Sequence, residues 1–142
     1  MPTLFTRIIE GEIPGRFVWR DDRAVAFLTI APITAGHTLV VPVDEVDHWL
    51  DLGSDLAAHL MHVAQEVGKA QRSAFDPVRV GLMVAGLEVP HCHLHVLPIG
   101  SEGDLSFAKA DHDPDPAVLD DAADRLRAAL RAGGHGDVVP DA

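Results

Sequence analysis

Apolar positions along the chain recur with two different periods. Runs rich in β-branched and aromatic residues predict strands at 17–19, 24–28, 37–42, 78–84 and 91–98. Apolar residues spaced three and four apart predict a long helix capped by Ser54 and a terminal helix at 115–132. A short helix at 3–9 and a polar, mobile tail at 133–142 complete the predicted elements.

The order of these elements indicates the fold class. A block of strands, then a long helix, then strands again is typical of an α+β protein with a mainly antiparallel sheet. The 142 residues fit a single domain, with a core at 3–108 followed by the terminal helix and the tail. Because only 5% of the residues are aromatic and 47% are hydrophobic, we expect a core of Val, Leu, Ile and Ala.

The net charge and the cysteine content limit the classes of partner and the cellular location that we expect for this protein. The formal net charge of −11 argues against a nucleic acid polymer, although local donors can still bind a small anionic substrate. Cys92 is the only cysteine, so no disulfide can form within the chain, which fits a cytoplasmic location. We find neither a transmembrane run nor a secretory signal, and therefore expect no membrane partner.

Three histidines gather in the segment His91-Cys92-His93-Leu94-His95. If this segment is a strand, alternation places the three imidazoles on one face and Cys92 and Leu94 on the other. We therefore expect Cys92 to be buried and inert. Since three polar rings in a row are costly to bury, a purely structural role does not explain the pattern.

Two kinds of chemistry fit the cluster. A metal could be held by two of the histidines with help from His37, Glu88 or Asp104, but the strand rise puts His91 and His95 about 13 Å apart, too far for all three to share one ion. Alternatively, a neutral imidazole attacks phosphorus at pH 7 while its neighbours orient it and donate hydrogen bonds to the phosphoryl oxygens. We favour this second chemistry, with neither metal nor cofactor.

The segment 91–98 resembles the signature of the histidine triad (HIT) family, His-φ-His-φ-His-φ-φ with φ apolar. Residues 5–14 resemble the opening segment of that family, and residues 35–42 resemble its central strand, including a fourth histidine, His37. The resemblance covers roughly 3–108. It implies a five-stranded antiparallel sheet with one long central helix, and a homodimer whose sheets are joined.

The resemblance also implies an activity, namely hydrolysis or transfer at the α-phosphate of nucleotide conjugates. In that scheme His93 attacks and forms a nucleotidyl-histidine, and His95 donates a hydrogen bond to the phosphate. His37 packs near His91, and His91 orients the nucleophile.

The sequence departs from the family pattern in three places. Thr3 and Thr6 occupy the places of the Cys-x-x-Cys pair that binds a structural zinc in many members. The polar Gly-Gln-Ser segment before the triad is Gly86-Leu87-Glu88 here. Where an acidic residue commonly holds the ribose, Thr29 follows Phe27 and Leu28.

These departures bear on the substrate. Leu87, Glu88, Phe27 and Thr29 are our candidate substrate-binding residues. Glu88 is either a general acid for the leaving group or a residue that faces solvent, and we favour the solvent-facing interpretation.

The sequence therefore predicts a histidine triad hydrolase or nucleotidyl transferase that acts on a phosphoramidate or a dinucleoside polyphosphate. Two alternatives stay open: a nucleotide-binding module with little turnover, and a metal-dependent enzyme that uses His-x-His ligands. Outside the cluster, Trp49 either flanks the pocket or caps the core, and we favour the core. We expect His59 and His62 to be solvated or to face a dimer partner.

Overall fold

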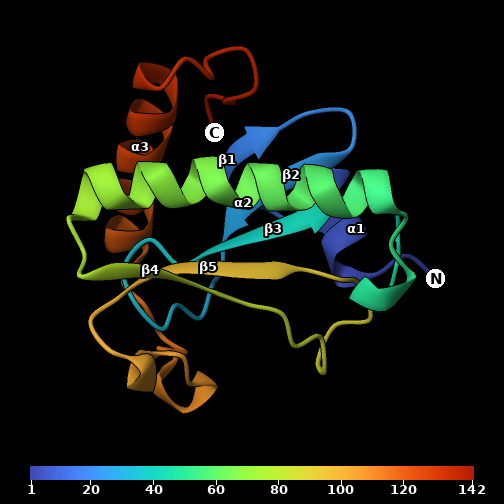
Figure 1. Cartoon of the computed structure of the whole chain (residues 1–142), viewed down its shortest axis with the longest axis horizontal. Helices are drawn as coiled ribbons and strands as arrows, with labels where there is room; N and C mark the ends of the chain where they lie inside the picture. The colour runs from blue at the N-terminus through green and yellow to red at the C-terminus, as the bar shows by residue number, and fades with distance from the viewer.

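A computed structural model describes all 142 residues and contains one five-stranded sheet. Neighbouring strands are antiparallel and follow the order β1-β2-β3-β5-β4 (Figure 1). The predicted α+β class with a five-stranded antiparallel sheet is confirmed. The strands are β1 (Phe17–Arg20), β2 (Ala24–Leu28), β3 (Thr38–Pro42), β4 (Arg79–Met83) and β5 (Leu94–Ile99).

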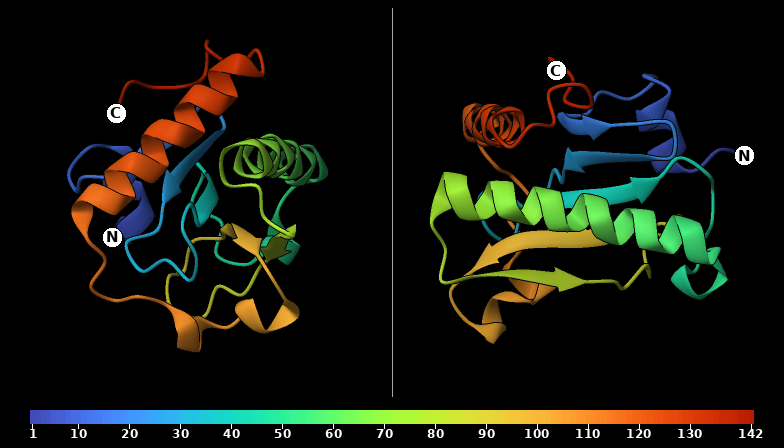
Figure 2. Two further views of the ribbon diagram at one scale, coloured as in Figure 1. Left: turned by 90° about the vertical axis from the view of Figure 1, so that its left-hand side faces the viewer. Right: turned by 45° about the horizontal axis from the view of Figure 1, so that its top comes forward.

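Two long helices cover one face of this sheet. Both α2 (Ser54–Phe75) and α3 (Pro116–Ala132) place an apolar stripe against it, and α2 runs lengthwise along β4 and β5 (Figure 2). The stripe of α2 includes Leu60, Val63 and Val67, each no more than 1% exposed. They join the main core cluster with residues of β2, β3 and β5. None of the helices is long and apolar enough to cross a membrane.

The opposite face carries shorter elements. Phe5 and Ile8 of α1 (Leu4–Ile9) pack on β1, β2 and β3 in a second, smaller core cluster. After β5, the chain forms two short 3-10 helices, η2 (Glu102–Asp104) and η3 (Phe107–Lys109), which lie on the side of the sheet away from α2 (Figure 1). This face therefore remains only partly covered by secondary structure.

A buried glutamine ties α2 to the two central strands. The amide nitrogen of Gln71, which is fully buried, donates to the carbonyl oxygens of Gly36 at 2.9 Å and Val96 at 2.8 Å. Gly36 has a φ of +87°, and an added Cβ would lie 2.6 Å from the Phe75 ring. Glycine is thus required by both backbone conformation and space at the turn that leads into β3.

Several predicted boundaries need correction. The predicted strand 91–98 begins only at Leu94, because the chain turns before it: the His91 amide donates to Val89 and the Cys92 amide to Val46. The cap of α2 is Gly53 rather than Ser54.

Two side chains outside the strands also lie differently from what the sequence suggests. The prediction that Trp49 belongs to the core is wrong, since Trp49 begins the 3-10 helix η1 (Trp49–Asp51) and is 51% exposed. In the predicted tail, Val139 packs into the main core cluster, and the Arg20 amide donates to the carbonyl of Val138.

Candidate active site

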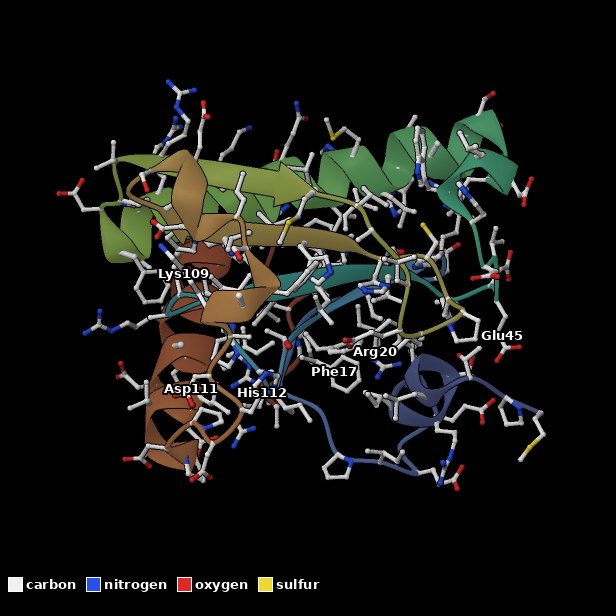
Figure 3. The ribbon with its side chains drawn as sticks, turned by 90° about the horizontal axis from the view of Figure 1, so that it is seen from below. Phe17, Arg20, Glu45, Lys109, Asp111 and His112 are labelled. Carbon is white, nitrogen blue, oxygen red and sulfur yellow. The ribbon has the colours of Figure 1, made fainter.

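The histidine cluster lies on the face of the sheet that carries α1. Figure 3 looks onto this face, where Phe17 and Arg20 lie near α1 and Lys109 belongs to the segment after β5. His37, His91, His93 and His95 are all buried, at 0 to 7% exposure. Histidines separated by up to 58 positions thus form one cluster.

His37 fixes the protonation of His95. The Ile33 amide donates to Nδ1 of His37 at 3.1 Å, so in the neutral ring the proton of His37 must be on Nε2. That Nε2 lies 2.9 Å from Nδ1 of His95 and donates to it. The proton of a neutral His95 is therefore on its own Nε2, which makes no hydrogen bond within the protein and can donate to a ligand.

His93 is held in the opposite tautomer. Its Nδ1 lies 2.8 Å from the backbone carbonyl oxygen of His91 and donates to it. The lone pair of the neutral ring is therefore on Nε2, which has no hydrogen-bond partner in the protein. An imidazole in this state is a nucleophile whose orientation is set by a backbone atom.

His91 is locked on both sides. Its Nε2 donates to the carbonyl oxygen of Pro42 at 2.7 Å, and its Nδ1 accepts from the hydroxyl of Thr3 at 2.7 Å. The Thr3 hydroxyl in turn accepts from the Thr6 amide at 3.1 Å, and the Glu45 carboxylate accepts from the Thr3 amide. The residue that orients His93 is thus tied to the start of α1 and to the end of β3.

Burial keeps the reacting histidines neutral. It lowers the pKa of His95 to about 3, aided by repulsion from His93 and His37, and lowers the pKa of His37 to about 4, aided by repulsion from His93. The pKa of His93 is lowered mainly by burial too, while the His91 carbonyl and the charge of Glu88 oppose the shift. At neutral pH the cluster therefore offers one imidazole lone pair and one N–H donor.

Aromatic rings enclose the cluster. The ring centroids of Phe5 and His93 are 4.8 Å apart in an edge-to-face arrangement, and those of His95 and Phe107 are 5.0 Å apart in the same arrangement. The ring centroids of His93 and His95 are also 4.8 Å apart. The side chains of α1 and η3 thus restrict the orientation of both open imidazoles.

Two sequence-based expectations about the histidines need revision. His37 contacts His95 and not His91, because β3 pairs with β5 so that Leu39 is opposite His95, and His91 precedes the strand. Strand alternation applies only to His95, because His91 and His93 precede β5 and lie in the turn that leads into it. The expectation that Cys92 is buried is confirmed, at 2% exposure, and burial raises the pKa of its thiol.

The four candidate substrate-binding residues fall in two places. Phe27 is 3% exposed and packs edge-to-face on Phe5, while the hydroxyl of Thr29 accepts from the Ala31 amide. Leu87 is 95% exposed and Glu88 is also exposed, as the favoured interpretation of Glu88 requires. The charge of Glu88 nevertheless acts on His93.

A pocket of about 170 Å³ opens beside His93. Its walls come from two connecting segments, one after β3 and one between β4 and β5. We refer to it as the loop pocket. It is lined by Asp47, His48, Trp49, residues 84–87, Cys92 and His93.

The side chains do not form a metal site. No group of three or more His, Cys, Asp or Glu residues is arranged to hold an ion. Both ring nitrogens of His37 and of His91 are already used in hydrogen bonds. This use of the histidines favours the nucleophilic over the metal-binding interpretation.

Several residues around the histidine cluster could hardly be assigned to the site from the sequence. Thr3 and Thr6 are conspicuous because they replace a cysteine pair, but nothing in the sequence indicates that Thr3 bonds His91. Phe5 and Gln71 follow ordinary helical periodicity and read as core positions. Trp49 belongs to an irregular segment, where no period indicates which way it faces.

The fold and the cluster together define a class: α+β proteins that present neutral, hydrogen-bonded imidazoles beside an antiparallel sheet. Residues 10–101 match the HIT domain family, and the chain belongs to this histidine triad family of nucleotide-binding proteins and hydrolases.

Individual relatives agree with this assignment. The Bacillus subtilis protein hit is 33% identical over 106 residues, which cover 71% of this chain and 73% of that protein. A zinc-bound histidine triad family protein from Mycobacterium smegmatis superposes with a TM-score of 0.80 at 28% identity, covering 94% of this chain and 96% of that one. A hypothetical histidine triad nucleotide-binding protein from Sulfolobus tokodaii gives a TM-score of 0.80 at 26% identity over 90% and 91%.

Proposed function

We propose that this chain is a nucleotide hydrolase or nucleotidyl transferase in which Nε2 of His93 attacks the α-phosphate of a nucleotide conjugate. The observation that carries the proposal is the hydrogen bond from Nδ1 of His93 to the His91 carbonyl, which leaves the lone pair on Nε2. As the Nε2–P bond forms, the ring becomes cationic, and the same carbonyl stabilises the proton on Nδ1.

His95 has a complementary role in this proposal. Its Nε2–H, set by His37, donates to a non-bridging phosphoryl oxygen on which negative charge grows in the transition state. The bond from phosphorus to the leaving group then breaks, and the leaving group takes the electron pair and a proton from water. Water or another acceptor next attacks the nucleotidyl-histidine and regenerates the neutral imidazole.

The nucleoside is proposed to lie on the α1 side of His93. Phe27 packs edge-to-face on the Phe5 ring, and Thr29, directly after β2, offers a hydroxyl for the ribose. Arg20 lies on the same face, stacked 4.3 Å from the centre of the Phe17 ring (Figure 3). Leu87 and Glu88 lie near the other substituent of the phosphorus.

A homodimer is also part of the proposal. β4 is at an edge of the sheet, so its outer backbone groups are unpaired within this chain. Apolar side chains accompany that edge, with Leu82 41% and Val84 36% exposed, and Met61 of α2 47% exposed. Sedimentation equilibrium should give twice the chain mass, and Leu82→Glu should shift it toward the monomer. The cytoplasmic location stays a prediction from the sequence.

Trapping of the intermediate tests the proposed reaction. Wild-type protein incubated with an adenosine 5′-phosphoramidate and quenched in base should carry an added adenylyl mass on a peptide that contains His93. His93→Ala should lose the label while its circular dichroism is unchanged, and His62→Ala, at an exposed position on α2, should keep it. A label that persists in His93→Ala contradicts the assignment of the nucleophile. A wild type that binds nucleotide without being labelled favours the nucleotide-binding module.

A further inference from the structure

The loop pocket lies beside the proposed nucleophile, His93. His93 is 7% exposed and lines this pocket, and its Nε2 has no partner in the protein. The Cys92 amide donates to the Val46 carbonyl at 2.7 Å, which ties the segment carrying Asp47 and Trp49 to the segment carrying His93. The same hydrogen bond therefore holds together the walls of the pocket and the segment that carries the nucleophile.

The charges around this pocket are negative. Asp47 lines it, and the field of Asp47 helps raise the pKa of the Cys92 thiol at its wall. Glu88 follows the lining segment 84–87, and its charge acts on His93. No Lys or Arg side chain lines the pocket. An anionic leaving group, such as a second phosphate, is repelled here, whereas an ammonium group is attracted.

The remaining walls suit an apolar arm that carries such a charge. Trp49 is 51% exposed and lines the pocket, and an indole is the aromatic ring that best stabilises a nearby ammonium group by a cation–π contact. Val84, Ala85 and Leu87 add apolar surface from the segment between β4 and β5. By contrast, the cation Arg20 lies on the α1 side of the face, with the proposed nucleoside site (Figure 3).

We propose that the loop pocket selects substrates whose leaving group is an amine with a second, protonated amino group on a short apolar arm, joined to the nucleotide through a P–N bond. This inference rests on the proposed function and explains Leu87 and Glu88, which replace polar uncharged residues of the family pattern. The reaction breaks the P–N bond, the nitrogen keeps the electron pair and takes a proton from water, and the diamine leaves.

Three adenosine 5′-phosphoramidates of equal chain length test the selection: those of 1,3-diaminopropane, propylamine and β-alanine. The reacting bond is the same in all three, and only the distal charge differs. We expect kcat/KM to fall from the cationic through the neutral to the anionic arm, by about tenfold at each step at low salt, with most of the change in KM. Added salt should reduce the ratios.

Paired variants locate the selection. Asp47→Asn and Glu88→Gln should each lower the ratio of cationic to neutral kcat/KM, and the double variant should bring it close to one. Asp51→Asn, an exposed carboxylate of η1 outside the pocket, should retain the wild-type ratio. Because each variant supplies its own ratio, a general loss of activity does not imitate the result.

The outcomes separate the two proposals. Equal kcat/KM for the three compounds, or a wild-type ratio in the double variant, overturns the selection while the His93 mechanism stands. If His93 is not labelled by any of the three compounds, the proposed function fails, and the selection fails with it.

Discussion

Replacement of His37 by phenylalanine is the sharpest test of how the cluster is organised. His37 is 2% exposed and receives a hydrogen bond from the Ile33 amide while it donates one to His95. Phenylalanine keeps the ring but removes both bonds. The Ile33 amide and Nδ1 of His95 are then left unpaired, at a cost of about 1–3 kcal/mol each to the free energy of unfolding.

The catalytic effect follows from the tautomer of His95. Without the donor at Nδ1, His95 can carry its proton on either nitrogen and can rotate, so Nε2 no longer presents a fixed N–H to the phosphate. Loss of one such donor costs about 10²–10³ in kcat at most. Since the donor is only partly lost, we expect kcat to fall by about 10- to 100-fold, with a smaller change in KM.

His37→Gln provides the matched variant. Its side-chain oxygen can accept from the Ile33 amide and its nitrogen can donate to His95, so it should recover most of kcat. Thr34→Val is the control for stability alone. It removes the bond from the Thr34 hydroxyl to the Pro98 carbonyl, in the same turn, without touching a histidine.

Three measurements decide the question. Steady-state kinetics with an adenosine 5′-phosphoramidate give kcat and KM, urea titration gives stability, and nitrogen-15 NMR gives the tautomer of His95. If folded His37→Phe has the kcat of wild type, or its His95 still carries the proton on Nε2 alone, the relay from Ile33 through His37 has no role in catalysis.

Further predictions concern stability. His37 and His95 are protonated near pH 6.5 in the unfolded chain but only near pH 4 and pH 3 in the folded one, so the unfolded chain binds more protons between these values. Urea titrations should therefore show stability falling as pH drops below about 6.5, by about 1.4 kcal/mol per pH unit for each histidine; a flat profile contradicts the assigned shifts. Thr3→Val should cost about 1–2 kcal/mol in the same assay and Thr3→Ser much less, because Val removes the hydroxyl that pairs with Nδ1 of His91 and with the Thr6 amide, whereas Ser keeps it; equal losses would show that these two bonds do not stabilise the fold. Gly36→Ala should raise the free energy of the folded state by at least about 1 kcal/mol, because the backbone has a positive φ and the added Cβ overlaps the Phe75 ring. A thermal melt identical to that of wild type would show that this turn does not require glycine.

The sequence predicts the elements of this fold better than the contacts between them. Runs of β-branched and aromatic residues are enough to predict the five strands, three of which are buried on both faces, and helical periodicity is enough for α2, which buries one face. Neither pattern gives the partner of His37, which depends on the pairing of Leu39 with His95 across two strands that lie far apart in the sequence. A one-residue change of register would point the ring to the other face.

The same limit applies to His91 and Trp49. Alternation of side chains applies only to a strand, but the chain turns before β5. There, the hydrogen bond from the Cys92 amide to the Val46 carbonyl helps to position the side chains of residues 91–93. The sequence allows Trp49 either to flank the pocket or to cap the core, and the structure shows that the favoured core position is wrong, since Trp49 lines the loop pocket. Both errors fall in irregular segments, where no repeating pattern links position to exposure.

The chemical state of the site is decided by burial in spite of the net charge. A chain with a formal charge of −11 attracts protons and so favours charged histidines. The pKa values of His37 and His95 are nevertheless lowered, because desolvation of the rings at 2% and 7% exposure outweighs that field. In the proposed reaction, the phosphate is therefore met by one oriented N–H group and one lone pair rather than by cations. Because the phosphate is not bound by a cationic side chain, charge attraction contributes little to its binding. In the proposed selection, the charges that distinguish one leaving group from another are those of Asp47 and Glu88.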